Sequence, residues 1–214
     1  MKKYLKLVLV VLMILIMFGF KDKDKNILIY IDPGHGGIDG GCVGYDGTYE
    51  KDINLNISLE LRDILINLGY NVLLTRIGDY DLANDNSKNR KRDDIIRRCE
   101  MINQADIFVS IHCNAYPDNS ISGAQVFFLD DEEKELAEDI QKSIKEMFNN
   151  TNREVNRIQN KYILENTSKI GCIVEVGFLS NPHDLKLLKD LDYQRNIGYA
   201  IALGINDFIH NNTF

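Results

Sequence analysis

Two histidines and two glutamates occupy positions in the sequence where side chains could meet to do chemistry. His35 lies in a glycine-rich segment after an apolar run, and His112 ends another apolar run. Glu50 begins a segment with helical spacing, and Glu175 lies near the end of a later apolar run. A catalytic zinc site uses imidazole and carboxylate ligands, an open position for water and a nearby carboxylate base. Together, these four residues could perform metal-assisted hydrolysis.

Each of the four residues also has a structural interpretation. Glu50 at a helix start is stabilised by the helix dipole without a metal, and a histidine after a strand is commonly a hydrogen-bonded structural residue. Glu175 is harder to explain, because a carboxylate among apolar neighbours is unfavourable to bury unless it is paired or functional. His183 and His210 lie in surface-like helical contexts, and we interpret them as structural.

The glycine-rich segment that carries His35 does not match a phosphate-binding loop. Counted from Gly34, the third glycine of a G-x-G-x-x-G motif would fall on Asp39, and a helix begins only near Glu50. The sequence also contains no G-x-x-x-x-G-K-[ST], H-E-x-x-H or G-x-S-x-G motif. Nucleotide binding, a helical zincin site and a serine-hydrolase elbow are therefore not expected.

The elements that must position the four residues alternate along the chain. Short β-branched runs predict strands, and apolar residues at helical spacing predict helices. We expect strands at residues 26–32, 70–76, 106–112, 124–129 and 169–176, and helices at residues 50–68, 91–103, 132–148 and 192–210, with a short one opening at 181–182. This alternation indicates an α/β fold: a single domain with a mostly parallel β-sheet covered by helices on both faces. The carboxyl ends of its strands would bring the candidate residues to one edge.

The N-terminal segment and the net charge indicate where the protein acts. Residues 1–20 combine lysines with an apolar run, which predicts a signal peptide or N-terminal membrane anchor, and residues 21–26 form a charged linker. We therefore expect export, a membrane contact only through this segment, and a catalytic domain at residues 27–214. The formal net charge of −7 argues against nucleic-acid binding. The four cysteines show no C-x-x-C pair, so we expect buried thiols, with a disulfide as the alternative.

Five motifs follow one another in the part of the chain after the linker. They are Asp32-Pro-Gly-His35-Gly-Gly, Glu50-Lys-Asp-Ile-Asn-Leu55, Leu74-Thr-Arg76, Ser110-Ile-His112-Cys-Asn114 and Val174-Glu175-Val-Gly-Phe-Leu-Ser-Asn181. In this order the motifs closely resemble the zinc-dependent N-acetylmuramoyl-L-alanine amidases of bacterial cell walls, the amidase-3 family. The resemblance implies that His35, Glu50 and His112 bind one Zn²⁺ per chain and that Glu175 is the catalytic residue. Asp32 or Asn114 would orient the ligands.

The resemblance also implies a substrate and a setting. The substrate would be peptidoglycan, cut at the amide between the lactyl group of N-acetylmuramic acid and L-alanine, at the extracytoplasmic face of the membrane or in the cell wall. The compact layout resembles germination-specific amidases that modify spore-cortex peptidoglycan, and such an enzyme could need an activating or targeting protein. Two alternatives remain open: an anchored peptidoglycan-binding or scaffolding protein without turnover, and a zinc peptidase acting on the stem peptide.

Overall fold

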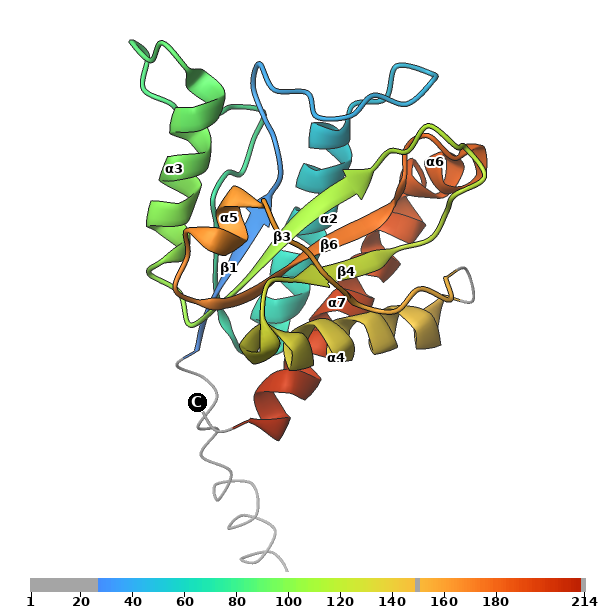
Figure 1. The fold of residues 1–214 in the computed structure, drawn as a ribbon. Helices are drawn as coiled ribbons and strands as arrows, with labels where there is room; N and C mark the ends of the chain where they lie inside the picture. Colours follow the sequence, from blue (N-terminus) through green and yellow to red (C-terminus); the bar gives the residue numbers. More distant parts are fainter. Residues whose placement is uncertain (1–26, 149–150, 213–214) are drawn as a thin grey trace, which may run out of the picture.

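The computed structural model describes residues 27–148 and 151–212, so the expected signal peptide or anchor and the charged linker lie outside the described residues. Six strands form one sheet in the order β2-β1-β3-β6-β4-β5 (Figure 1). The strands are β1 (Leu28–Pro33), β2 (Asn71–Leu74), β3 (Ile107–Asn114), β4 (Gln125–Phe128), β5 (Asn156–Arg157) and β6 (Ile170–Phe178). Neighbouring strands are parallel except β4 and β6, which are antiparallel. The expected mostly parallel sheet is confirmed.

Helices cover both faces of this sheet. They are α2 (Glu50–Asn67), α3 (Arg90–Ile102), α4 (Asp131–Met147), α5 (Tyr162–Glu165), α6 (Pro182–Leu188) and α7 (Leu191–Asn211). Helices α2, α4 and α7 form one layer, and α3 and α5 lie over the opposite face (Figure 1). Successive side chains of a strand point to opposite faces, so Ile29 and Ile31 join the larger apolar core while Tyr30 joins the smaller one.

Each predicted element is present, with its bounds within two residues of those expected. The short helix α6 has the predicted start, because the Asn181 side chain accepts hydrogen bonds from the backbone N–H groups of His183 and Asp184, and Pro182 follows as the first helical residue. Strand β5 and helix α5 were not predicted. They contain only two and four residues, too few to produce a periodic pattern.

The parallel pairing of β3 with β6 places two candidate residues side by side. His112 is the register partner of Glu175, so their side chains leave the same face of the sheet. Lower on these strands the same face is apolar, with Phe108 and Ile173 in the core under α3 and α5. Gly171 makes room for this packing, since a Cβ there would come within 2.1 Å of the Phe108 ring.

All four cysteines are free thiols. Cys99, Cys113 and Cys172 are buried and Cys42 is partly buried, which agrees with the expectation of thiols. Among residues 27–148 and 151–212, no helix is long and apolar enough to cross a membrane.

Candidate metal centre

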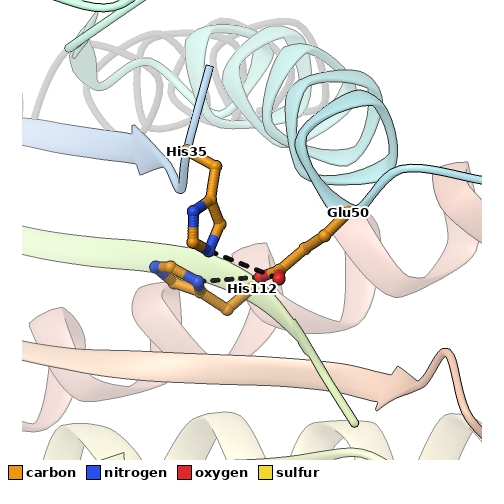
Figure 2. A group of neighbouring side chains, drawn as sticks. All are labelled: His35, Glu50 and His112. Carbon is orange, nitrogen blue, oxygen red and sulfur yellow. Dashed lines mark hydrogen bonds and ion pairs between the residues drawn. The ribbon is translucent and has the colours of Figure 1, made fainter. Parts of the chain in front are cut away.

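His35, Glu50 and His112 meet at the carboxyl end of the sheet, from three different segments (Figure 2). Their ligand atoms all lie within 4.8 Å of one another. Glu50 lies between the two rings: its Oε2 is 3.3 Å from His35 Nε2, and its Oε1 is 2.9 Å from His112 Nδ1. The rings meet edge to face, with centroids 5.1 Å apart. The structure thus brings together the three residues singled out as metal ligands.

Glu50 is held by donors other than the histidines. Its side chain is 2% exposed. Oε2 accepts the backbone N–H of Cys42 at 2.8 Å, and Oε1 accepts the backbone N–H of Cys113 at 3.1 Å and the Asn54 amide at 3.2 Å. Burial by itself would raise the pKa of Glu50, but hydrogen bonds from His112 and His35 outweigh it and lower the pKa well below its usual range. Glu50 is therefore a fixed carboxylate.

His35 is held in an uncommon backbone conformation. Its φ of 63° is in the left-handed region, which is rare for residues other than glycine. The next residues close a tight turn, in which the Gly36 N–H donates to the Asp39 carbonyl at 2.9 Å and the Asp39 N–H donates back at 3.1 Å. Such strain persists only where surrounding contacts enforce it, and it is frequent at functional sites.

Two buried arginines enforce this conformation through the carbonyl groups around His35. Arg98 on α3 donates to the carbonyls of Pro33 at 2.7 Å and His35 at 2.6 Å. Arg76 donates to those of Pro33 and Gly34, both at 3.0 Å. Both side chains are almost fully buried, at 1% exposure for Arg76 and 2% for Arg98. The role of Arg98 was not predicted, because most residues of its helix are charged and nothing in the sequence distinguishes Arg98 from the other arginines.

The two residues expected to orient the ligands contact other groups. Asp32 is fully buried and accepts hydrogen bonds from Thr75 at 2.6 Å, Ser110 at 2.7 Å and Arg98 at 2.7 Å. The Asn114 side-chain oxygen accepts the N–H of the next residue at 2.8 Å. Asp32 therefore anchors Arg98 and contacts no proposed ligand through these bonds.

Asp39, which was not singled out as a site residue, lies beside His35 instead. Its Oδ2 is 2.9 Å from His35 Nδ1, and its Oδ1 is 2.8 Å from Lys91 Nζ on α3. Partial burial would raise the pKa of Asp39, but hydrogen bonds from Lys91 and His35 lower it to about 2. Burial likewise disfavours charged His35, yet the adjacent Glu50 and Asp39 raise its pKa.

Glu175 is buried next to this group. It is 8% exposed, and its Oε2 has no hydrogen-bond partner among the described residues. Burial raises its pKa, and the negative Glu50 adds to the effect, while His112 opposes it. No ion pair involving Glu175 is present in the described part of the chain, so a structural ion pair does not explain its burial.

A cavity of about 110 Å³ opens beside the two histidines, and its lining also includes Lys91, Arg98 and Ile163.

Comparison with known proteins identifies the family. Residues 29–207 match the family model of the amidase-3 domain, described as N-acetylmuramoyl-L-alanine amidase. The chain belongs to the amidase-3 family. It is 40% identical over 185 residues to the germination-specific N-acetylmuramoyl-L-alanine amidase of Bacillus subtilis. The alignment covers 83% of this chain and 78% of that protein.

Solved structures of amidases have the same fold. The CwlD amidase from Clostridioides difficile, determined in complex with the GerS lipoprotein, superposes with a TM-score of 0.84 and 38% identity over 87% of this chain and 100% of that chain. An N-acetylmuramoyl-L-alanine amidase from Clostridium difficile 630 gives a TM-score of 0.80 and 26% identity, covering 88% of this chain and 100% of that chain.

These matches confirm the expected fold, family and reaction. The protein is a hydrolase with N-acetylmuramoyl-L-alanine amidase activity, and its substrate is peptidoglycan. The amidase-3 family is zinc-dependent in general, and the group formed by His35, Glu50 and His112 is able to hold a metal ion.

Proposed function

We propose that this amidase binds one Zn²⁺ through His35, Glu50 and His112 and uses Glu175 as its catalytic acid and base. One observation carries the proposal: three ligand atoms lie within 4.8 Å of one another beside a buried carboxyl group, one oxygen of which has no partner in the described part of the chain. The bond cleaved is the amide between the lactyl group of N-acetylmuramic acid and L-alanine.

The donor atoms suit the ion. Two imidazoles and one carboxylate form a common set of three protein ligands in catalytic zinc sites. His35 Nδ1 is already bound to Asp39, which leaves Nε2 facing Glu50. When bound, Zn²⁺ polarises a carbonyl oxygen and lowers the pKa of water.

The protein's own residues account for the proton transfers. Glu175 Oε2 has no competing hydrogen bond from residues 27–148 or 151–212, so it can accept a proton from the attacking water. The same oxygen then donates that proton to the departing nitrogen of L-alanine. Burial raises the pKa of Glu175 toward the range in which a carboxyl group can both accept and donate a proton.

We infer that the enzyme acts outside the cytoplasm. Residues 1–20 would be the signal peptide or membrane anchor and residues 21–26 the linker, followed by the catalytic domain at 27–214. The Bacillus subtilis relative is named as germination-specific, which supports a role in the spore cortex. The CwlD structure contains the GerS lipoprotein, which supports an activating or targeting partner for this chain as well.

Metal analysis and product analysis test the proposal together. The purified protein should contain about one zinc ion per chain, and alanine at His35, Glu50 or His112 should reduce that content. Mass spectrometry of digested peptidoglycan should find a new L-alanine N-terminus with intact muramic acid. A cut within the stem peptide would contradict the assigned bond, and equal digestion of vegetative and cortex peptidoglycan would contradict the cortex role.

A further inference from the structure

Asp39 connects His35 to helix α3. One carboxylate oxygen of Asp39 lies 2.9 Å from His35 Nδ1, and the other lies 2.8 Å from Lys91 Nζ. The other ring nitrogen of His35 faces Glu50 at 3.3 Å. A single carboxylate thus bridges a proposed metal ligand and a lysine from a distant part of the chain.

We propose that Asp39 and Lys91 are positioning residues for His35, in which Asp39 fixes the orientation and tautomer of the ring and Lys91 fixes Asp39. The inference rests on the proposed function, since the ring orientation matters to metal binding only if His35 is a ligand. A carboxylate accepts hydrogen bonds and donates none, so a proton is required on His35 Nδ1. In the neutral ring that a metal ligand requires, the lone pair is then on Nε2, the nitrogen that faces Glu50.

Helix α3 controls both the backbone and the side chain of His35. Arg98 donates to the His35 carbonyl at 2.6 Å and thereby helps to hold the left-handed backbone. Lys91 precedes Arg98 by seven residues, close to two helical turns, so both side chains lie on the same face of α3. Both also line the cavity beside the histidines. The hydrogen bond from Arg98 holds the backbone of His35, and the hydrogen bond to Asp39 holds the orientation of its ring.

The exposure of Lys91 argues against a mainly structural role for the ion pair. The Lys91 side chain is 69% exposed, whereas that of Asp39 is partly buried at 21% exposure. An ion pair with one well-exposed partner is screened by water and contributes little to stability. Substitution of either residue should therefore leave the fold intact and change the metal site.

Zinc affinity tests this role directly. The full chain is compared with Asp39→Ala, Asp39→Asn and Lys91→Met by competition for Zn²⁺ with a chromophoric chelator. Loss of a carboxylate that orients a ligating histidine typically weakens metal binding about 10- to 100-fold, which we expect for Asp39→Ala. Asp39→Asn should recover part of the affinity, because its amide oxygen still accepts from Nδ1. Lys91→Met should weaken binding less than Asp39→Ala.

A second readout separates positioning from general loss of structure. Replacement of zinc by Co²⁺ gives an absorption spectrum that reports ligand geometry, and it should change in Asp39→Ala. Lys88→Met is the matched control, because Lys88 is exposed and forms no ion pair among the described residues. Its zinc affinity and spectrum should equal those of the unchanged protein. If Asp39→Ala does not fold, as judged by circular dichroism, Asp39→Asn and Lys91→Met provide the test.

The outcomes distinguish this inference from the proposed function. Unchanged zinc affinity and an unchanged cobalt spectrum in the folded Asp39 variants would overturn the positioning role. If His35→Ala abolishes zinc binding while the Asp39 variants bind normally, only the positioning role is wrong. If His35→Ala binds zinc normally, the ligand assignment is wrong and this inference fails with it.

Discussion

Glu175 and His112 are direct register partners across the parallel strands β6 and β3. This pairing places a buried carboxyl group beside a proposed zinc ligand at the carboxyl end of the sheet. A register shift of one residue in β3 or β6 would turn the side chain of His112 or Glu175 to the opposite face of the sheet. The larger apolar core lies on that face, so its packing fixes the register and with it the position of Glu175.

Replacement of Glu175 by Gln should abolish most turnover without loss of zinc. Glutamine has nearly the same shape but cannot accept the proton from water, and positioned general bases contribute about 10²–10⁴-fold to rate. The rate of release of L-alanine amino termini from peptidoglycan measures the effect. Glu60→Gln, at an exposed position on α2, is the control and should retain full activity. Normal cleavage by Glu175→Gln would show that another group takes the proton.

In the zinc-free protein, the same substitution should increase thermal stability near neutral pH. The pKa of Glu175 is raised in the folded state above the ordinary value of 4.5, chiefly by burial. Folding therefore favours the protonated carboxyl, and the stability from this group is lost as the pH rises from the ordinary pKa through the raised one. At neutral pH the carboxyl ionises freely in the unfolded chain but at a cost in the folded protein, and a neutral glutamine carries no such cost.

Melting temperatures of the two zinc-free proteins at two pH values provide the measurement. Below about pH 4 the carboxyl is protonated in both the folded and the unfolded state, so the difference between the proteins should disappear. A Glu175→Gln protein that melts at the same or a lower temperature at neutral pH would show that the buried carboxyl is not destabilising.

Arg98→Met should destabilise the protein by about 3–5 kcal/mol, because removal of one partner of a buried ion pair leaves an uncompensated charge. The Arg98 guanidinium is 2.7 Å from Asp32 and 2.8 Å from Asp94. Urea unfolding at neutral pH measures the change. Arg97→Met removes only an exposed pair with Glu100 and should cost about 0–1 kcal/mol. Equal effects of the two substitutions would contradict a structural role for the buried network.

The buried Asp32 also predicts how this stability depends on pH. Burial would raise its pKa, but the charge of Arg98 and hydrogen bonds from Thr75 and Ser110 lower it below the ordinary 3.8. Its contribution is therefore present above the ordinary pKa and is lost as the pH falls through the lowered one. The difference in unfolding free energy between the unchanged protein and Asp32→Asn should shrink in acid. A difference that stays constant would contradict the lowered pKa.

Gly34→Ala should impair zinc binding through His112. A Cβ at this position would lie 2.3 Å from His112 Cε1 and 2.4 Å from its Nε2, so the ring must move. Zinc titration of the variant should show weaker binding, by about 10-fold or more, as for other losses of ligand orientation. Gly78→Ala is the control, since its Cβ would come no closer than 3.3 Å to the Tyr80 ring. Equal zinc affinity in both variants would show that His112 does not need its present position.

Much of the architecture was predictable from local patterns. Buried strands and amphipathic helices each produce a characteristic hydrophobic pattern in the sequence. The bounds of every element except the short β5 and α5 were therefore expected to within two residues. The four candidate residues stood out because imidazoles and carboxylates lie at strand ends, at a helix start and within an apolar strand. The resemblance to the amidases then implied their roles, which remain a proposal. Their motifs also identified the family.

Other features depend on contacts between segments far apart in the sequence. The antiparallel pairing of β4 with β6 joins two strands that are far apart in the sequence, and neither strand's own residues indicate which strand it pairs with. The roles of Asp39 and Arg98 arise only when α3 packs over the turn that carries His35, which brings charges more than 50 residues apart into contact. The residue types along the chain therefore determined which groups could bind zinc and move a proton. Only the tertiary structure decided which other side chains hold those groups in place, because that depends on which distant segments pack against each other.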